Sequence, residues 1–318
     1  MNQRPKRLRL GLIAALTLLT FAACSSPEAL SYPNRTRAEA IPANAVKRSP
    51  DGDLYPPILY SPDFMEPIPL PGPVNTAGAE DSPFIAPDGT LYFFFTPDVR
   101  VPLEGQLTDD VTGIYAAPPL EGGFGEPERV WLQDPGLLSL DGCEFTDGEV
   151  MWFCTAREGL TGLHWFTAAW ADDRWSNWQI ADFDPAYDVG ELHIHGDELY
   201  FHSSQPEGIG GIDLWLSTYL EGAWGEPVNL TSVNSEADDS RPYLTPDGDE
   251  LWFTRWYMGT PAVFRSFRTQ EGWIEPELIV SQFAGEPTLD AEGNLYFVHH
   301  FYDTGVMLEA DLYVAYRR

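Results

Sequence analysis

Basic residues are scarce in this sequence. It contains 18 lysine and arginine residues against 49 aspartate and glutamate residues, which gives a formal net charge of −31. Such an acidic surface repels nucleic acids and anionic lipid headgroups, so nucleic-acid binding is excluded as its role. Divalent cations, basic partners and neutral sugars are compatible with this charge. Solubility in a salty habitat is an equally good explanation for it.

The sequence also lacks the local motifs of the common enzyme classes. It has no G-x-S-x-G, no P-loop, no dinucleotide-binding fingerprint and no H-E-x-x-H. The glycines of PEGIGGIDLW (206–215) lie between two expected strands and no helix follows them, so they predict a turn. No local motif therefore predicts a reaction.

No apolar run is long enough for a comfortable membrane span. The run LGLIAALTLLTFAA (10–23) follows four basic residues within 4–9 and has the length of a signal-peptide core. It ends at Cys24, and TFAAC resembles a bacterial lipoprotein signal, with Phe21 where that family usually has Leu. The resemblance implies removal of 1–23, lipidation of Cys24 and anchorage in an envelope membrane, periplasmic or at the cell surface. An ordinary secretory signal is the alternative, and both predict export.

The rest of the sequence repeats one pattern. SEADDSRPYLTPDGDELWFTR (235–255) has counterparts near residues 80 and 285, and aligning their hairpin turns gives five units. The turns contain Gly89, Gly148, Asp197, Gly248 and Gly293. An aromatic strand follows each turn, then a third strand, and in most units a fourth strand with Glu-Pro. Four short strands at a period of about 45–60 residues predict an all-β fold with one β-propeller blade per unit.

The fifth unit lacks its fourth strand, and the N-terminal part of the domain supplies a match. FMEPIPLPGPVNTAGAEDSP (64–83) follows AWGEPVNLTSVNSEADDSRP (223–242) almost residue by residue. We therefore expect residues 58–318 to form a single five-bladed propeller whose last blade is completed by the N-terminal strand, which removes an open sheet edge. A six-bladed ring is the alternative. Residues 24–57 show no hairpin signal and predict a flexible tether between lipid and domain.

The repeat resembles a known family. The pattern D-S-x-P-x-x-x-P-D-G-x-x-L-x-F, followed by G-G-x-D-L-W and W-G-E-P-V-N-L, is similar to the WD40-like propeller repeat of periplasmic TolB-type proteins. The match is close over 205–255, whereas the second and third units are degenerate. The resemblance implies a scaffold that binds partners or ligands outside the cytoplasm. It implies no single activity, because function lies in sites placed on the fold.

Two cysteines flank the hairpin turn of the second unit. Counting outward from Gly148 and Glu149 places Cys143 directly opposite Cys154. Opposed residues of an antiparallel pair have Cα atoms about 4.5–5.5 Å apart, within disulfide range. We therefore predict a cross-strand disulfide in an oxidising compartment. Two buried thiols are the alternative.

One set of polar residues converges in a propeller, because first strands line the central channel. Counting back from each turn gives one position per unit at the channel mouth, and neighbouring positions add further carboxylates. The predicted ring consists of Ser82, Asp141, Gly190, Arg241 and Glu286, with Asp81, Glu191 and Asp239 beside them. The functional interpretation is a pocket for a small polar ligand, a sugar or a divalent cation. The structural interpretation is that the carboxylates pair with Arg241 and hold neighbouring blades together.

The same ring supports an alternative function. Five-bladed glycoside hydrolases of the arabinanase and xylosidase type use a carboxylic acid and a carboxylate base at such entrances. EDSPFIAPDGTLYFF is similar to their first-blade motif, which would make Asp81 the base, with Glu191 or Glu286 as the acid. The Glu-Gly-Pro motif of that family is absent, and Ser82 separates Asp81 from the following proline. We therefore expect no catalysis, with hydrolysis as the alternative.

The third unit contains two histidines that are candidates for a metal site. His193 and His195 would point to the same face of one strand, a spacing that can bind a metal. No cysteine or carboxylate at ligand spacing accompanies them, so the sequence predicts no cofactor. We expect a monomer that contacts the membrane only through its lipid.

Overall fold

The computed structural model describes residues 31–181, 183 and 189–318. The residues from Tyr32 to Arg318 form one compact unit. The predicted lipidation site and leader lie outside the described residues. No helix in the described part of the chain has the length and apolar character needed to cross a bilayer.

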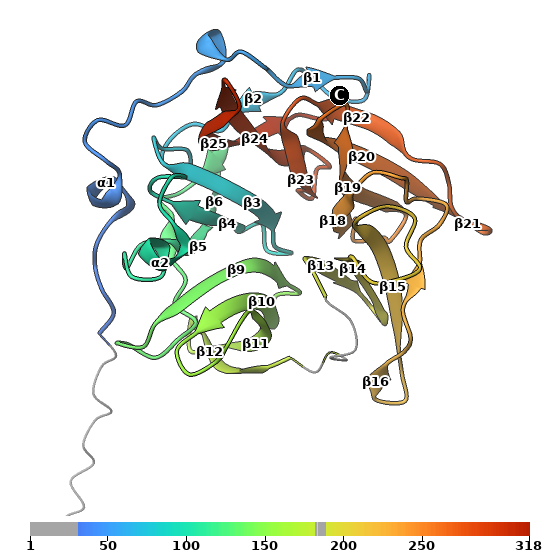
Figure 1. Ribbon diagram of the computed structural model, residues 1–318, viewed down its shortest axis with the longest axis horizontal. Helices are drawn as coiled ribbons and strands as arrows, with labels where there is room; N and C mark the ends of the chain where they lie inside the picture. Colours follow the sequence, from blue (N-terminus) through green and yellow to red (C-terminus); the bar gives the residue numbers. More distant parts are fainter. Residues whose placement is uncertain (1–30, 182, 184–188) are drawn as a thin grey trace, which may run out of the picture. The chain divides into compact units, whose positions relative to one another are not determined.

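The unit is built from antiparallel groups of strands arranged about a common centre, which is a β-propeller (Figure 1). In each group the first strand lies innermost and the following strands succeed one another outward. The first group contains β3 (Ala79–Ile85), β4 (Leu91–Thr96), β5 (Gly113–Ala117) and β8 (Glu128–Arg129). The second contains β9 (Ser139–Thr146), β10 (Val150–Arg157), β11 (His164–Ala171) and β12 (Arg174–Ile180).

The remaining groups follow the same plan. The third contains β13 (Leu192–His195), β14 (Glu198–Ser203), β15 (Asp213–Leu220) and β17 (Val228–Asn229). The fourth contains β18 (Asp239–Leu244), β19 (Glu250–Tyr257), β20 (Thr260–Thr269) and β22 (Glu277–Ser281), with β1 (Ile58–Leu59) paired to its outer edge. The fifth contains β23 (Ala284–Leu289), β24 (Leu295–Asp303) and β25 (Val306–Ala315).

The N-terminal segment completes the fifth group. Strand β2 (Ile68–Pro69) pairs antiparallel with β25, with Ile68 opposite Val314. An isolated bridge between Phe64 and Arg317 extends the contact. The predicted pairing of the two ends of the domain is therefore confirmed, and it covers the outer edge of β25.

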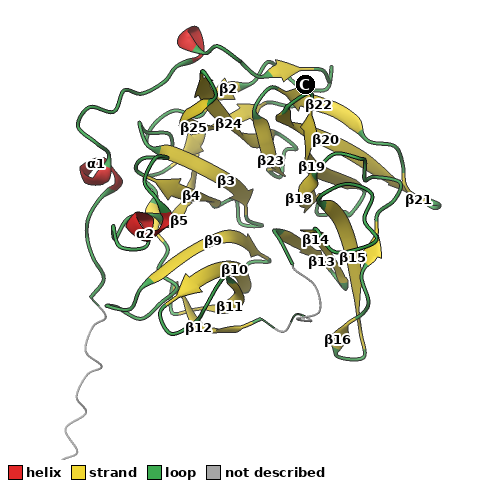
Figure 2. Ribbon diagram, in the orientation of Figure 1, coloured by secondary structure: helices red, strands yellow, loops and turns green. Residues whose placement is uncertain are grey.

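The expected fourth strands are shorter than the sequence predicts. In three groups the segment that leads to the fourth strand first forms a two-residue piece paired in a hairpin and then joins the main sheet. These pieces are β7 (Gly123–Phe124), which pairs with β6 (Pro119–Leu120), β16 (Ala223–Trp224) and β21 (Gly272–Trp273). Two of these pieces, β16 and β21, lie at the periphery of the molecule (Figure 2). Strand β12 was not predicted, because its segment lacks the Glu-Pro pattern of the other units.

Buried aromatic side chains on the second strands form much of the core. Phe93, Phe153, Phe201, Phe253 and Phe297 are all fully buried. They occupy the same position of the aromatic strand in every group, so each repeat contributes one such ring between neighbouring sheets. Burial of a phenylalanine side chain contributes about 1.5–3 kcal/mol to stability, which explains why this position is aromatic throughout.

The predicted flexible tether is wrong for its described part. Residues 32–57, which we call the strap, run along the outside of the propeller and contain α1 (Arg37–Ala40) and the short helix η1 (Pro50–Gly52) (Figure 1). A further single-turn helix, α2 (Leu103–Gln106), lies between β4 and β5. Proline and charge content predicted a tether, but several of the strap's charged side chains pair with buried groups of the propeller.

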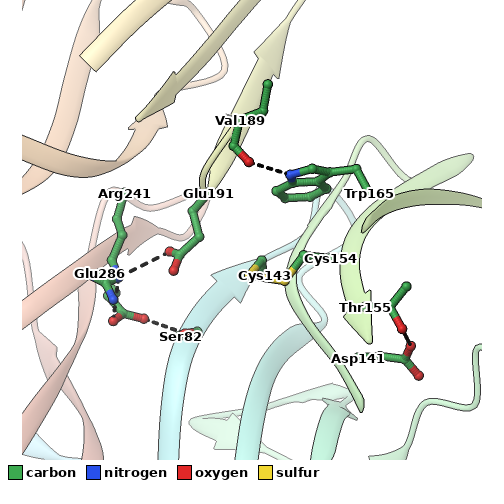
Figure 3. Close-up of a disulfide and its surroundings, with 10 residues drawn as sticks. All are labelled: Ser82, Asp141, Cys143, Cys154, Thr155, Trp165, Val189, Glu191, Arg241 and Glu286. Atoms are coloured by element: carbon green, nitrogen blue, oxygen red, sulfur yellow. Dashed lines mark hydrogen bonds and ion pairs between the residues drawn. A yellow bond between two sulfur atoms is a disulfide. The ribbon is translucent and has the colours of Figure 1, made fainter. Parts of the chain in front are cut away.

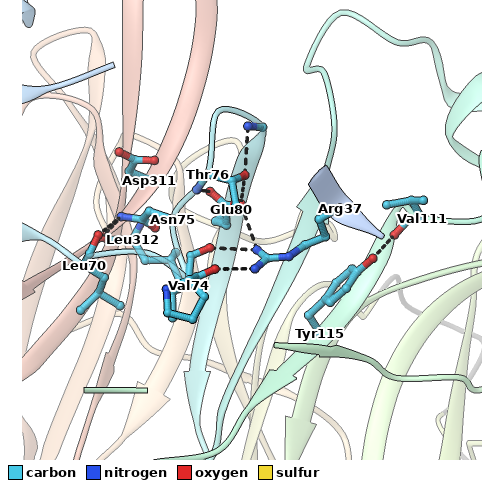
Figure 4. A network of polar contacts seen from close by, with 12 residues as sticks. Arg37, Leu70, Val74, Asn75, Thr76, Glu80, Val111, Tyr115, Asp311 and Leu312 are labelled. Atoms are coloured by element: carbon cyan, nitrogen blue, oxygen red, sulfur yellow. Dashed lines mark hydrogen bonds and ion pairs between the residues drawn. The ribbon is translucent and has the colours of Figure 1, made fainter. Parts of the chain in front are cut away.

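Arg37 is the most deeply inserted of these side chains. Its guanidinium lies 3.2 Å from the carboxylate of Glu80 and donates to the carbonyl of Val74 at 2.8 Å (Figure 4). It also packs over the rings of Phe93 and Phe95. Arg37 is 6% exposed and Glu80 is fully buried, so neither charge has solvent to replace its partner.

Two more charged side chains, Lys47 and Asp53, attach the rest of the strap to the propeller. Lys47 lies 2.5 Å from Glu309 and also contacts Asp311, both of which are buried. Asp53 lies 2.7 Å from Nε2 of His299, and both side chains are buried. The strap is therefore an integral part of the folded domain.

We predict that Arg37→Met lowers the free energy of unfolding by about 3–5 kcal/mol, because it leaves the Glu80 carboxylate buried without a cation. Urea unfolding of the purified protein measures this. The matched control is Arg100→Met, which removes a pair with Asp98 from an arginine that is 68% exposed and should cost no more than about 1 kcal/mol.

A double variant provides the decisive comparison. In a Glu80→Gln background, Arg37→Met should cost much less than in the wild type, because the charge it would leave unpaired is gone. Equal costs in the two backgrounds would show that Arg37 contributes only packing.

Candidate functional site

The channel mouth is a small cavity to which every strand group contributes. Its lining includes one residue at or just before the first strand of each group, at the same level along the channel in all five. These residues are Ser82, Cys143, Glu191, Arg241 and Glu286. All except Glu191 have a positive φ, between 50° and 56°. Each of the four positive-φ residues lies at a break in register between the first and second strand of its group, a β-bulge that turns the side chain toward the centre.

Four of the eight residues predicted for the ring line this cavity, namely Ser82, Glu191, Arg241 and Glu286, whereas Asp81, Asp141, Gly190 and Asp239 do not. Asp141 and Gly190 were counted back from the turn, but the hairpins of the second and third groups close more tightly than the Pro-Asp-Gly turns. The bulge position is therefore Cys143 in the second group and Glu191 in the third. The predicted register of strand β9 is wrong by one residue for the same reason, since Cys154 lies opposite Gly142 and not opposite Cys143.

Asp141 and Asp239 do not belong to the mouth. Asp141 accepts a hydrogen bond from Thr155 at 2.6 Å and lies 3.5 Å from Arg157. Asp239 lies 2.6 Å from Nε of Arg255. Both carboxylates are buried and pair with an arginine of their own strand group, and not with Arg241 as the structural interpretation of the ring expected.

The charged residues of the mouth surround Arg241. Its Nε lies 2.7 Å from Glu286 and 3.3 Å from Glu191, and Ser82 donates a hydrogen bond to Glu286 at 2.5 Å (Figure 3). The Arg241 side chain is 37% exposed, so solvent weakens these ion pairs. Arg241 therefore already occupies the space between the two carboxylates.

The pKa values of the acidic residues near Arg241 are shifted in opposite directions, up for Glu286 and Glu191 and down for Asp81. Burial raises the pKa of Glu286 to about 8, although Arg241 opposes the shift. Burial also raises the pKa of Glu191, again against Arg241. Burial acts on Asp81 in the same direction, but His300, 3.7 Å away, and Arg241 outweigh it and keep the Asp81 pKa below its usual value.

Glu144 is the mouth residue that the sequence analysis missed. It follows the bulge at Cys143, lines the cavity and is 8% exposed, and neither carboxyl oxygen has a hydrogen-bond partner among the described residues. Burial raises the pKa of Glu144 to about 8, and the negative charges of Glu191 and Glu286 act in the same direction, against Arg129. Its position occupies the place of a proline in three other groups, so no repeat signal marked it.

The disulfide lies next to the mouth. Cys143 and Cys154 are bonded, with Cα atoms 5.4 Å apart, and join the first two strands of the second group (Figure 3). Because Cys143 lines the cavity, the bond fixes the bulge that carries it.

The two histidines do not form a metal site with their neighbours. The ring of His193 is buried among aromatic rings, 4.6 Å from Phe145 and 5.0 Å from Tyr243, and burial lowers its pKa to about 3. His195 instead lies 3.2 Å from the carbonyl of Pro246. Within the described residues no three His, Cys, Asp or Glu side chains are grouped as a metal ion requires.

The cavity itself is small. Its volume is about 50 Å³, whereas pockets that enclose a drug-sized ligand measure about 300–1,000 Å³. The mouth can therefore hold a few water molecules or an ion, and it has no room for a sugar ring.

Comparisons with known proteins bear on the fold only. No protein-family model and no curated protein matches the sequence. Similar solved structures include TolB from Acinetobacter baumannii (14% identity, TM-score 0.44), and the match covers 76% of this chain and 55% of that one. Others are the endo-arabinase of Bacteroides thetaiotaomicron (15%, 0.44, covering 77% and 96%) and GH43B of a Bacteroides ovatus xyloglucan locus (13%, 0.46, covering 77% and 53%).

TolB-type propellers are thus among the similar structures, as the repeat predicts. This chain spans about half the length of that TolB chain. Similarity at this level assigns no ligand or reaction to the chain, and the propeller fold rests on the strand pairing described above.

We predict that Glu144 makes stability fall as the pH rises. The raised pKa means that the folded protein retains a proton between about pH 4.5 and 8 that the unfolded chain has lost. Because the folded state binds more protons in this window, its free energy of unfolding decreases with increasing pH. Glu144→Gln removes this contribution, so its melting temperature should exceed that of the wild type at pH 9 by more than at pH 5.

The control is Glu149→Gln, which changes an exposed glutamate in the adjacent turn. It should shift the melting temperature equally at both pH values. A constant difference between Glu144→Gln and the wild type across the pH range would mean that Glu144 is ionised in the folded protein.

Proposed function

We propose that the protein is an exported, lipid-anchored five-bladed propeller that binds a partner or a small ligand without catalysing a reaction. The blade count is supported by the five first strands β3, β9, β13, β18 and β23, each followed by further antiparallel strands. Export and anchorage are supported by the leader and Cys24. Export is also compatible with the disulfide, because such bonds persist in oxidising compartments.

One observation supports the proposal that the protein does not catalyse hydrolysis. Glu286 and Glu191 both contact the same nitrogen of Arg241, inside a cavity of about 50 Å³. A glycosidase needs its two carboxyl groups on opposite sides of a bound glycosidic bond. Here an arginine occupies that space, so the ring works as a clamp that ties the inner ends of four strand groups together through Ser82, Glu191, Arg241 and Glu286.

The hydrolase alternative has one observation in its favour. A raised pKa at Glu286 and a lowered pKa at Asp81 are the pattern expected of an acid and a base. The pattern of pKa values also follows from burial, from the Asp81–His300 contact and from the charge of Arg241, without any substrate. The small volume of the cavity supports the clamp over the hydrolase.

We predict that the purified protein releases no reducing ends from arabino- or xylo-oligosaccharides. The Glu286→Gln variant should give the same signal as the wild type and as the Glu292→Gln control, whose glutamate is exposed in the turn of the same group. A reducing-sugar assay measures this. Sugar release that disappears in Glu286→Gln but persists in Glu292→Gln would establish hydrolysis and overturn the proposal.

We predict that Cys24→Ala releases the protein from the membrane fraction of a bacterial host and abolishes incorporation of labelled palmitate. Lipidation of this cysteine would supply the only anchor that the sequence predicts. The matched control is the double variant Cys143→Ala/Cys154→Ala, which removes the other two cysteines and should stay in the membrane fraction. Persistence of Cys24→Ala in the membranes would contradict lipid anchorage.

A further inference from the structure

A much larger cavity lies between the first and second strand groups. Its volume is about 540 Å³, within the range of pockets that enclose small molecules. It lies at the end of the sheets where the inner strands turn, since Asp88 and Gly148 from the two hairpin turns both line it. We call it the inter-blade cleft, and the channel-mouth residues discussed above are not part of it.

A tryptophan pair forms one wall of the inter-blade cleft. Trp170 and Trp175 face each other across the β11–β12 hairpin, with ring centroids 5.1 Å apart. The turn between them, Asp172 and Asp173, has positive φ at both residues, which closes it tightly and places Trp170 at the tip. Trp170 is 47% exposed, whereas Trp175 is buried and donates a hydrogen bond from Nε1 to the hydroxyl of Tyr92 in the first group at 3.2 Å. This bond fixes the wall across both groups.

A second aromatic surface comes from the segment after β8. Trp131 stacks on Tyr32 of the strap, with centroids 4.9 Å apart. The guanidinium of Arg129 lies 5.0 Å from the Trp131 ring and donates hydrogen bonds to the carbonyls of Ile114 and Thr112 at 3.0 Å. The charge of Arg129 is thus directed at the backbone, and one face of the indole already holds a cation.

The acidic residues of the cleft are unpaired. Four carboxylates line it, and no Lys, Arg or His nitrogen of the described residues lies within 4.0 Å of them: Asp88, Glu126, Glu128 and Asp173. The other basic lining residue is Arg174, which is exposed. Excess negative charge in a concave site raises the local concentration of cations.

We propose that the inter-blade cleft binds an organic cation, a positively charged amine attached to apolar carbon. Exposed tryptophan attracts such a cation through its ring face, and nearby carboxylates add charge complementarity that a neutral sugar would not use. The cleft is large enough for a ligand of this kind, and the mouth is not. The inference deepens the proposed binding function and rests on it, because it names the ligand class that the propeller would bind.

Choline and its neutral carbon isostere, 3,3-dimethylbutan-1-ol, test the role of charge directly. We expect choline and benzyltrimethylammonium to quench the tryptophan fluorescence of the full chain saturably, with choline binding about tenfold or more tightly than the alcohol. Higher ionic strength should weaken binding of the two ammonium ions and leave the alcohol unaffected.

Variants locate the site. Trp170→Ala should weaken choline binding about tenfold, whereas the matched control Trp256→Ala, an exposed tryptophan on β19 outside the cleft, should leave it unchanged. Asp173→Asn should weaken it a few-fold without disturbing the turn, because asparagine tolerates the positive φ of 57° at this position. Isothermal titration of each variant gives the affinity, and circular dichroism verifies that it is folded.

The outcomes separate this inference from the proposed function. Absence of saturable binding of either ammonium ion up to about 10 mM would overturn it, as would equal affinity for the alcohol or unchanged binding in Trp170→Ala. Saturable binding of xylobiose without binding of choline would also overturn it, because the ligand of the inter-blade cleft would then be a sugar and not a cation. None of these results bears on hydrolysis, which the reducing-sugar assay decides by itself.

Discussion

The fold depends on buried carboxylates at the start of the inner strands, each of which requires a cation. Three strand groups carry an acidic residue on the first strand, two residues before the β-bulge. Glu80 pairs with Arg37, Asp141 with Arg157, and Asp239 with Arg255. A buried charge left without a partner costs several kcal/mol, so every such position must be supplied with an arginine. In the second and fourth groups the arginine comes from the adjacent strand, and in the first it comes from the strap.

This difference explains why the strap is ordered. In the fifth group the matching position of the first strand is Ala284, which carries no charge. Its partner on the second strand is His299, and His299 contacts Asp53 of the strap. The strap thus completes the two groups that lack an internal partner, and these are the groups joined by the N- and C-terminal ends of the domain. Its contacts with Glu309 and Asp311 of β25 reinforce the pairing of β2 with β25.

The sequence was sufficient for the repeat, the blade order and the closing strand, because each rests on a pattern that recurs along the chain. It was insufficient where one unit departs from the others. A constant distance from turn to channel mouth placed Asp141 in the ring, but the shorter hairpin of the second group puts Cys143 there. Glu144 and the ordered strap have no counterpart in other units, so periodicity gives no signal for them. Pairing of Arg37 with Glu80 spans 43 residues and depends on the folded sheets.

The electrostatics of the mouth and of the inter-blade cleft lead to opposite conclusions about ligand binding. At the mouth, Arg241 lies against the carboxyl groups of Glu286 and Glu191 and offsets their charge, so little net charge remains to attract a ligand. In the cleft the carboxylates face solvent without partners, while Arg129 is committed to backbone carbonyls. Arg37, Arg157 and Arg255 pair with buried acids, whereas the exposed acids of the cleft have no cation within 4.0 Å among the described residues. Where such unpaired acids line a concave aromatic surface, they favour a cation from solution.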